Sequence, residues 1–175
     1  MKKISGLLST LWFVTAIQCL PRIAFSNPPL TIPVDANVRV GILSQESWIN
    51  AIVSDVEPRQ LVITLENFSG VQFPVATFIQ DGPSSPQLVS AFEVFVEARQ
   101  ALFLIVKWHY YLPGVDTEGD FYEVHAYDIQ RTSQGDPRFL KDPLLSGKFG
   151  SGFDGKQEGK RVHFPYKDAQ SILQK

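Results

Sequence analysis

Three apolar runs separated by short turns constrain the fold of this chain most strongly. They read LVSAFEVFVEA (residues 88–98), ALFLIVKWHYYL (101–112) and DFYEVHAYDI (120–129). Val, Ile, Phe and Tyr dominate them, which favours β-strands over helices. A helix is the alternative for residues 88–99, but the segment FEVFVE favours a strand. Because only RQ and PGVDTEG lie between the runs, we predict a meander of three consecutive antiparallel strands.

Shorter runs of the same kind precede this meander. Residues 38–43, 48–57, 61–66 and 71–79 are predicted strands, and the segment DGPSSP (81–86) is a clear loop. Pro74 lies inside the last of these strands, which indicates an edge strand or a bulge because proline has no N–H to donate.

The fold class predicted from these patterns is mainly β, an antiparallel sheet or a small β-sandwich. From Gln130 onward, glycine, proline and charged residues predominate, and isolated Phe and Leu side chains interrupt them. We expect this glycine-rich C-terminal region to be irregular structure laid over the sheet. A short helix is expected at residues 167–174.

The segment GSGFDG (150–155) has the glycine spacing of a dinucleotide-binding loop. That site needs an apolar strand before the glycines and a helix after them. The preceding LLSGK is short, and the following KQEGKRVHFP contains Gly159 and Pro165. We therefore interpret the glycines as structural, in a coiled loop from which Phe149 and Phe153 pack into the core.

The N-terminus has the pattern of a secretory signal peptide. Lys2 and Lys3 precede the apolar run ISGLLSTLWFVTAI, which is shorter than the roughly 20 residues of a membrane span. The small residues in AFS predict cleavage after Ser26, so that residues 1–26 are the signal and 27–175 form a single β-rich domain. A lipid-modified Cys19 and an uncleaved anchor are the alternatives. The expected location is periplasmic or secreted.

The composition of residues 27–175 excludes several classes of function. Removing residues 1–26 takes away three of the 16 basic residues and none of the 18 acidic ones, which leaves 13 against 18. With this acidic balance and no basic stripe, a nucleic acid is not an expected partner. No later segment is long enough to span a bilayer. The single cysteine, Cys19, leaves with the signal, so no disulfide is expected.

The hairpin from Lys107 to Asp128 holds the candidate functional residues. Residues of one parity share a face of a strand, so Lys107, His109 and Tyr111 lie together on the first strand. Pairing His109 with either Glu123 or His125 would add the same-parity residues of the second strand to that face. We expect an exposed polar and aromatic binding patch, with Leu104, Val106, Trp108 and Tyr110 facing the core. The predicted patch comprises Lys107, His109, Tyr111, Glu123, His125 and Tyr127.

Two classes of function are compatible with these residues. The first is a non-catalytic exported binding or inhibitory protein, of the toxin-immunity or enzyme-inhibitor type, whose partner is another protein and which needs no cofactor. Clustered Tyr and Trp side chains favour it because they anchor protein interfaces. The alternative is a small exported hydrolase that uses His109, His125 and Glu123, with or without a metal, since two imidazoles and a carboxylate are a known ligand set.

Overall fold

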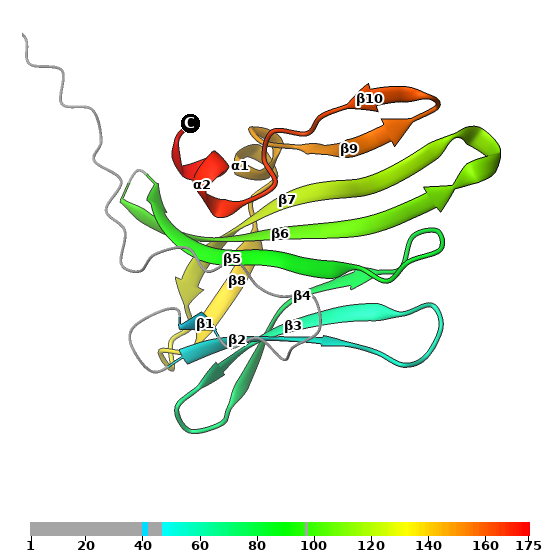
Figure 1. Ribbon diagram of the computed structural model, residues 1–175. Helices are drawn as coiled ribbons and strands as arrows, with labels where there is room; N and C mark the ends of the chain where they lie inside the picture. Colours follow the sequence, from blue (N-terminus) through cyan, green and yellow to red (C-terminus); the bar gives the residue numbers. More distant parts are fainter. Residues whose placement is uncertain (1–39, 42–46, 97) are drawn as a thin grey trace, which may run out of the picture.

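The computed structural model describes residues 40–41, 47–96 and 98–175. Two antiparallel sheets pack face to face, and the C-terminal segment covers the other face of the larger sheet (Figure 1). The predicted class, mainly β with a short C-terminal helix, is confirmed. The predicted signal peptide and its cleavage site lie outside the described residues. In the described part of the chain, no helix is both long and apolar enough to cross a membrane.

The smaller sheet contains the first four strands in chain order. Its order is β1-β2-β3-β4, so β4 is an edge strand. The register of β3 and β4 shifts next to Thr64, the partner of Pro74, so the proline lies at an edge and beside an irregularity, as predicted. The strands are β1 (Val40–Gly41), β2 (Ser47–Val53), β3 (Gln60–Asn67) and β4 (Gln72–Ile79).

The larger sheet is built around the predicted meander. Its order is β10-β9-β7-β6-β5, and β8 pairs with the far end of β7. The strands are β5 (Gln87–Val96), β6 (Arg99–Leu112), β7 (Thr117–Arg131), β8 (Pro137–Lys141), β9 (Ser151–Gln157) and β10 (Lys160–Val162), and the short helix η1 (Pro113–Val115) joins β6 to β7.

The larger sheet is buried on both faces over much of its length. Alternate residues of β6 face the two sides, with Leu104 and Val106 in the core between the sheets and Phe103 and Ile105 in a second core. The helices α1 (Pro143–Gly147) and α2 (Ala169–Leu173) close this second core. Below, the inner face is the one toward the smaller sheet, and the outer face is the one toward α1 and α2.

The glycine-rich region is not irregular throughout, in contrast to the prediction. It forms β8, β9 and β10, and GSGFDG enters β9 rather than a coiled loop. The reason is close backbone packing: Gly119 of β7 and Gly155 of β9 are direct partners, and a Cβ atom on either would meet the backbone of the other strand. Because β9 leads into β10, no helix N-terminus follows the glycines to receive a phosphate.

Candidate functional site

The register of the β6–β7 hairpin differs from both predicted pairings, by three residues from one and by five from the other. His109 pairs with Asp120, whereas Glu123 pairs with Val106 and His125 with Leu104. Leu112 and Thr117 pair across a loop with an even number of residues, whereas either predicted pairing needs an odd number, so the β7 side chains lie on the opposite face.

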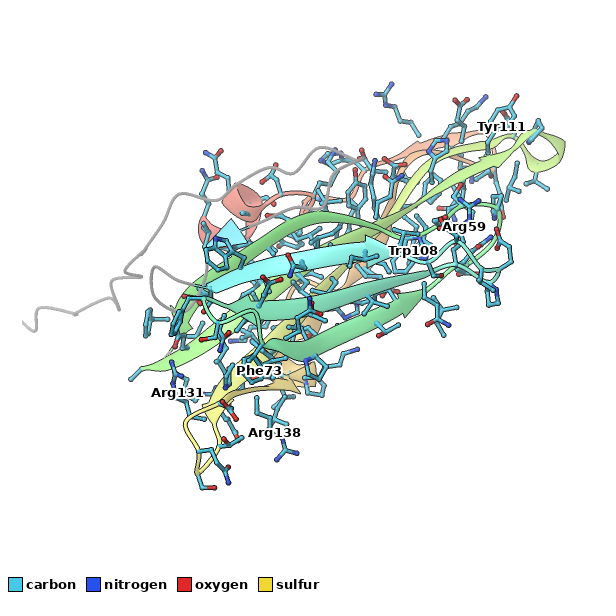
Figure 2. The ribbon with its side chains drawn as sticks, turned by 90° about the horizontal axis from the view of Figure 1, so that it is seen from below. Arg59, Phe73, Trp108, Tyr111, Arg131 and Arg138 are labelled. Atoms are coloured by element: carbon cyan, nitrogen blue, oxygen red, sulfur yellow. The ribbon has the colours of Figure 1, made fainter. Side chains whose placement is uncertain are left out.

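The six predicted site residues therefore do not form one patch. Lys107 and His109 lie on the outer face. Tyr111, two residues after His109 along β6, is 60% exposed at the tip of the hairpin (Figure 2). The remaining three, Glu123, His125 and Tyr127, lie on the inner face. The metal-ligand set of His109, His125 and Glu123 is thus not assembled, and the described residues contain no group of three or more His, Cys, Asp and Glu side chains that could hold a metal ion.

The outer face carries a compact cluster around Asp120. The carboxylate accepts hydrogen bonds from Lys107 Nζ at 2.7 Å and pairs with His109 Nδ1 at 2.8 Å. Tyr122 donates its hydroxyl to the same carboxylate at 3.4 Å. Burial alone would raise the pKa of Asp120, but the hydrogen bonds from Lys107 and His109 outweigh it and lower that pKa below its ordinary value.

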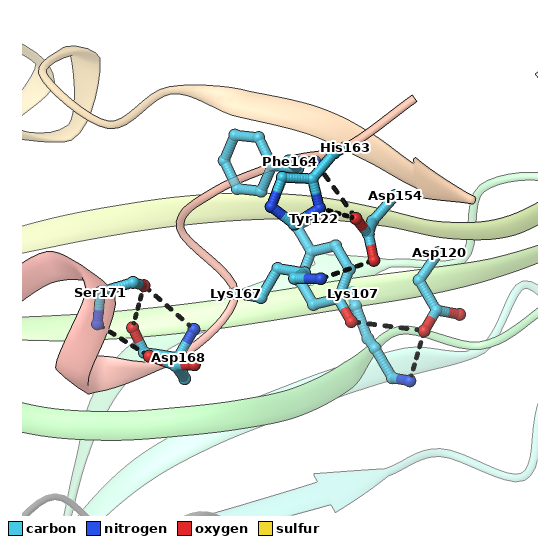
Figure 3. Close-up of polar contacts among 9 residues, drawn as sticks. All are labelled: Lys107, Asp120, Tyr122, Asp154, His163, Phe164, Lys167, Asp168 and Ser171. Carbon is cyan, nitrogen blue, oxygen red and sulfur yellow. Dashed lines mark hydrogen bonds and ion pairs between the residues drawn. The ribbon is translucent and has the colours of Figure 1, made fainter. Parts of the chain in front are cut away.

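A second cluster of the same composition lies beside the first. Asp154 accepts from Lys167 Nζ at 2.7 Å and pairs with His163 Nδ1 at 2.8 Å (Figure 3). Asp154 is the direct cross-strand partner of Asp120. Burial would raise the pKa of Asp154, but these hydrogen bonds lower it. We call the two groups together the outer carboxylate cluster, which comprises Asp120, Lys107, His109, Asp154, His163 and Lys167.

On the inner face, the half-buried Glu123 and the buried His125 form a pair. His125 is only 8% exposed, and its Nε2 lies 2.9 Å from Glu123 Oε2. The hydrogen bond from His125 lowers the pKa of Glu123 against the effect of burial, and Lys141 adds to the lowering. The ring of Phe78 packs on the imidazole at a centroid distance of 4.8 Å. The expected exposed patch is therefore wrong for His125 and for Tyr127, which are both buried between the sheets.

A groove runs between the edge strand β4 and the inner face of the larger sheet. Its first cavity, of about 460 Å³, is bounded by residues 76–79 of β4 on one side and by Lys141 of β8 on the other. Trp108 and Phe121 form part of the floor. The indole Nε1 of Trp108 donates to the carbonyl of Ile79 at 3.1 Å, which ties the end of β4 to the larger sheet (Figure 2).

A second cavity, of about 370 Å³, continues the groove toward the tip of the β6–β7 hairpin. The two cavities share Asp81 and Phe121. Its walls come from the β6–β7 hairpin and the β9–β10 turn, and we call it the tip cavity. It is lined by Asp81, Tyr110, Leu112, Val115, Thr117, Phe121, Phe153, Gln157 and Glu158.

Tyr110 forms the wall of the tip cavity next to the loop after β4. Burial, a hydrogen bond to Asp81 and the negative charge of that carboxylate raise the pKa of Tyr110 to about 12. A Cβ atom on Gly82 would lie 3.0 Å from the tyrosine ring, so only a glycine lets the loop pack this closely. With a pKa of about 12, the Tyr110 hydroxyl stays protonated at neutral pH.

The groove is lined by three of the six residues of the predicted patch. Glu123, His125 and Tyr127 line the groove as predicted site residues, but on the face opposite to His109. Asp81, Phe153 and Glu158 were missed because they come from three separate turns or strands, and no spacing rule connects them. Comparison of the chain with known protein families, curated proteins and solved structures finds no match.

Proposed function

We propose that this protein is a non-catalytic exported binding or inhibitory protein that holds a segment of another protein in the groove between β4 and the larger sheet. The observation that carries the proposal is the groove itself: two adjoining cavities with a continuous aromatic floor. Aromatic side chains in a concave surface provide large contact areas at a small cost in side-chain entropy, which suits a protein interface.

The geometry of β4 favours an extended segment of the partner. Gln80 N–H donates to Arg59 on the β3 side, whereas the carbonyl of Ile79 faces the larger sheet and accepts from Trp108. Because backbone groups alternate along a strand, Thr77 also directs its N–H and carbonyl toward the groove. Such an edge provides backbone hydrogen bonds to an added strand.

The contacts of His125, the histidine that lines the groove, argue against a catalytic role for it. The hydrogen bond with Glu123 occupies Nε2 of His125, and the imidazole is covered by Phe78. The side chain is therefore positioned by packing rather than presented to a substrate. The outer-face His109 lies on the other side of the sheet and cannot assist it.

Export is part of the proposal and rests on the N-terminal sequence. The Lys-Lys start, the short apolar run and the AFS segment support a periplasmic or secreted protein. Mass spectrometry of the exported chain should give a mass that begins at or close to Asn27. A full-length mass or a lipid-modified Cys19 would contradict this part of the proposal.

Site-directed photo-crosslinking in the cells that export the protein tests the binding role. A photoreactive residue at Lys141, in the groove wall, should crosslink a discrete protein partner. The same residue at Lys148, an exposed lysine that follows α1 on the outer face, is the matched control and should not. Equal crosslinking at both positions, or none at Lys141, would contradict the assignment of the groove as the binding surface.

A further inference from the structure

The tip cavity combines aromatic rings with acidic side chains and contains no basic residue. Tyr110, Phe121 and Phe153 provide the rings, and the Tyr110 and Phe153 centroids are 6.2 Å apart. Asp81 and Glu158 provide two carboxylates at the rim, and none of the lining residues is Lys, Arg or His. Aromatic faces and carboxylates both attract cations, so the two parts of this lining select the same kind of group.

Nearby cations do not neutralise the two carboxylates. Among the residues that the structure describes, neither Asp81 nor Glu158 forms an ion pair with a basic side chain. Lys156, next to the turn, is held by Asp116 at 2.7 Å. Lys107 is held by Asp120 on the opposite face of the sheet. Arg59, whose Nη1 donates to Ser85 in the loop of Asp81, pairs with Glu57. The lining residues of the cavity therefore carry a net negative charge that an incoming cation can offset.

Backbone contacts hold the rim of the cavity in place before any ligand arrives. Glu158 has a φ of 49°, and its N–H donates to Thr117 Oγ1 at 3.0 Å. Gly159 N–H donates to the carbonyl of Asp116, also at 3.0 Å. These bonds fasten the β9–β10 turn to the start of β7, so binding does not require the turn to be ordered.

We propose that the tip cavity receives an arginine side chain of the protein partner, with its guanidinium between the aromatic rings and the carboxylates of Asp81 and Glu158. The inference rests on the proposed function and specifies the chemistry of the partner. A guanidinium is planar, stacks on aromatic faces and has five N–H donors, so one group can serve two carboxylates. An ammonium is a compact, strongly hydrated charge that gains less from the rings.

Titration of the purified exported protein with N-acetyl-arginine amide, followed by NMR, tests this directly. The backbone amides of Thr117 and Glu158 should shift in a saturable way. N-acetyl-citrulline amide, which has the same shape without the charge, should bind at least tenfold more weakly, and N-acetyl-lysine amide should bind more weakly than the arginine probe. Equal binding of the citrulline probe would overturn the cation site, and tighter binding of the lysine probe would overturn the choice of arginine.

Matched variants locate the site. Asp81→Asn and Glu158→Gln should each weaken the arginine probe severalfold, and the double variant should abolish saturable binding. Asp136→Asn changes the charge equally but lies in the turn between β7 and β8, at the other end of β7, and should bind as the wild type does. Unchanged thermal unfolding would show that the variants are folded. Unchanged probe binding by the folded double variant would overturn the proposal.

The two proposals can fail separately. If Lys141 crosslinks a partner equally well in the wild type and in the Asp81→Asn/Glu158→Gln variant, the groove binds a protein but the arginine inference is wrong. If the arginine probe binds while no partner crosslinks at Lys141, the cation site is present but the proposed binding function is wrong.

Discussion

The outer carboxylate cluster and the tip cavity differ in the partners of their carboxylates. On the outer face, Asp120 and Asp154 each accept from one lysine and pair with one histidine, at 2.7–2.8 Å. On the groove side, Asp81 and Glu158 form no ion pair with a basic side chain in the described part of the chain. Asp81 forms a hydrogen bond with Tyr110 but has no cationic partner among the described residues. A carboxylate paired with cations of its own chain stabilises the fold, whereas one that lines a cavity without a cationic partner can bind a cation of another molecule.

The positions of Asp120 and Asp154 explain why each carboxylate needs a lysine and a histidine as partners. Asp120 and Asp154 are direct cross-strand neighbours, and like charges in that arrangement destabilise a sheet. Lys107 and Lys167 offset the repulsion from two sides. We therefore propose that the outer carboxylate cluster attaches β9 and the C-terminal segment, and that Asp81 and Glu158 of the tip cavity bind a ligand.

The largest effect is expected from a substitution that separates the backbones of β7 and β9 and so disrupts the outer carboxylate cluster. Gly155→Val should lower the free energy of unfolding by roughly 2–4 kcal/mol, because its side chain would meet the backbone of Glu118 and Gly119 and push β9 away from β7. Chemical denaturation measures the loss. Gly147→Ala is the control, since a Cβ atom there has no neighbour within 4 Å, and it should stay within about 0.5 kcal/mol. If Gly155→Val lowered the free energy of unfolding by less than Gly147→Ala does, the close packing of β9 on β7 at Gly155 would be contradicted.

A smaller effect is expected from loosening the groove wall. Trp108→Phe removes the indole donor to Ile79 and leaves space in the core, and should cost about 2 kcal/mol. Hydrogen exchange should accelerate at the Gln80 amide, which follows Ile79, and stay unchanged in β9. Phe68→Leu, at an exposed aromatic residue outside the groove, is the control. Faster exchange in β9 as well would mean that a substitution on the inner face also loosens the strands that carry the outer carboxylate cluster.

The outer cluster should also make stability depend on pH. Because the pKa of Asp120 is lower in the folded chain than its ordinary 3.8, the unfolded chain takes up the proton first as the pH falls. The stabilisation is therefore complete above about pH 5 and is lost progressively at lower pH. Asp120→Asn should cost about 1–2 kcal/mol at pH 7 and give a flatter acid profile in denaturation experiments. Parallel profiles for wild type and variant would exclude this role of Asp120.

Much of the fold could be predicted because the apolar pattern is local. The alternation in residues 101–112 and 120–129 specified the meander and the inward side of β6, where Leu104, Val106 and Trp108 are buried as expected. The same pattern could not specify the strands β8, β9 and β10. Their pairing depends on glycines meeting across two strands, Gly119 with Gly155, and such a contact has no signal within either segment.

The candidate site depends on register, which the sequence left open. An even-numbered loop after Leu112 placed Glu123 and His125 on the face opposite to His109. Both strands were predicted, but β7 begins at Thr117, before the predicted start at Asp120. Asp120 and Asp154 gave no sign of being neighbours, because they belong to strands that are separated by β8 and α1 in the chain. The existence of each strand could therefore be predicted here, whereas the side chains that come together in one site could not.

The central claim is that Asp120 and Asp154 stabilise the fold, whereas Asp81 and Glu158 of the tip cavity bind a ligand. The most direct test compares two double variants in one denaturation experiment at pH 7. Asp120→Asn/Asp154→Asn should lower the free energy of unfolding by about 2 kcal/mol or more, since four charge-assisted hydrogen bonds are weakened. Asp81→Asn/Glu158→Gln should stay within about 0.5 kcal/mol of the wild type. Equal losses, or a larger loss for the groove variant, would contradict the account.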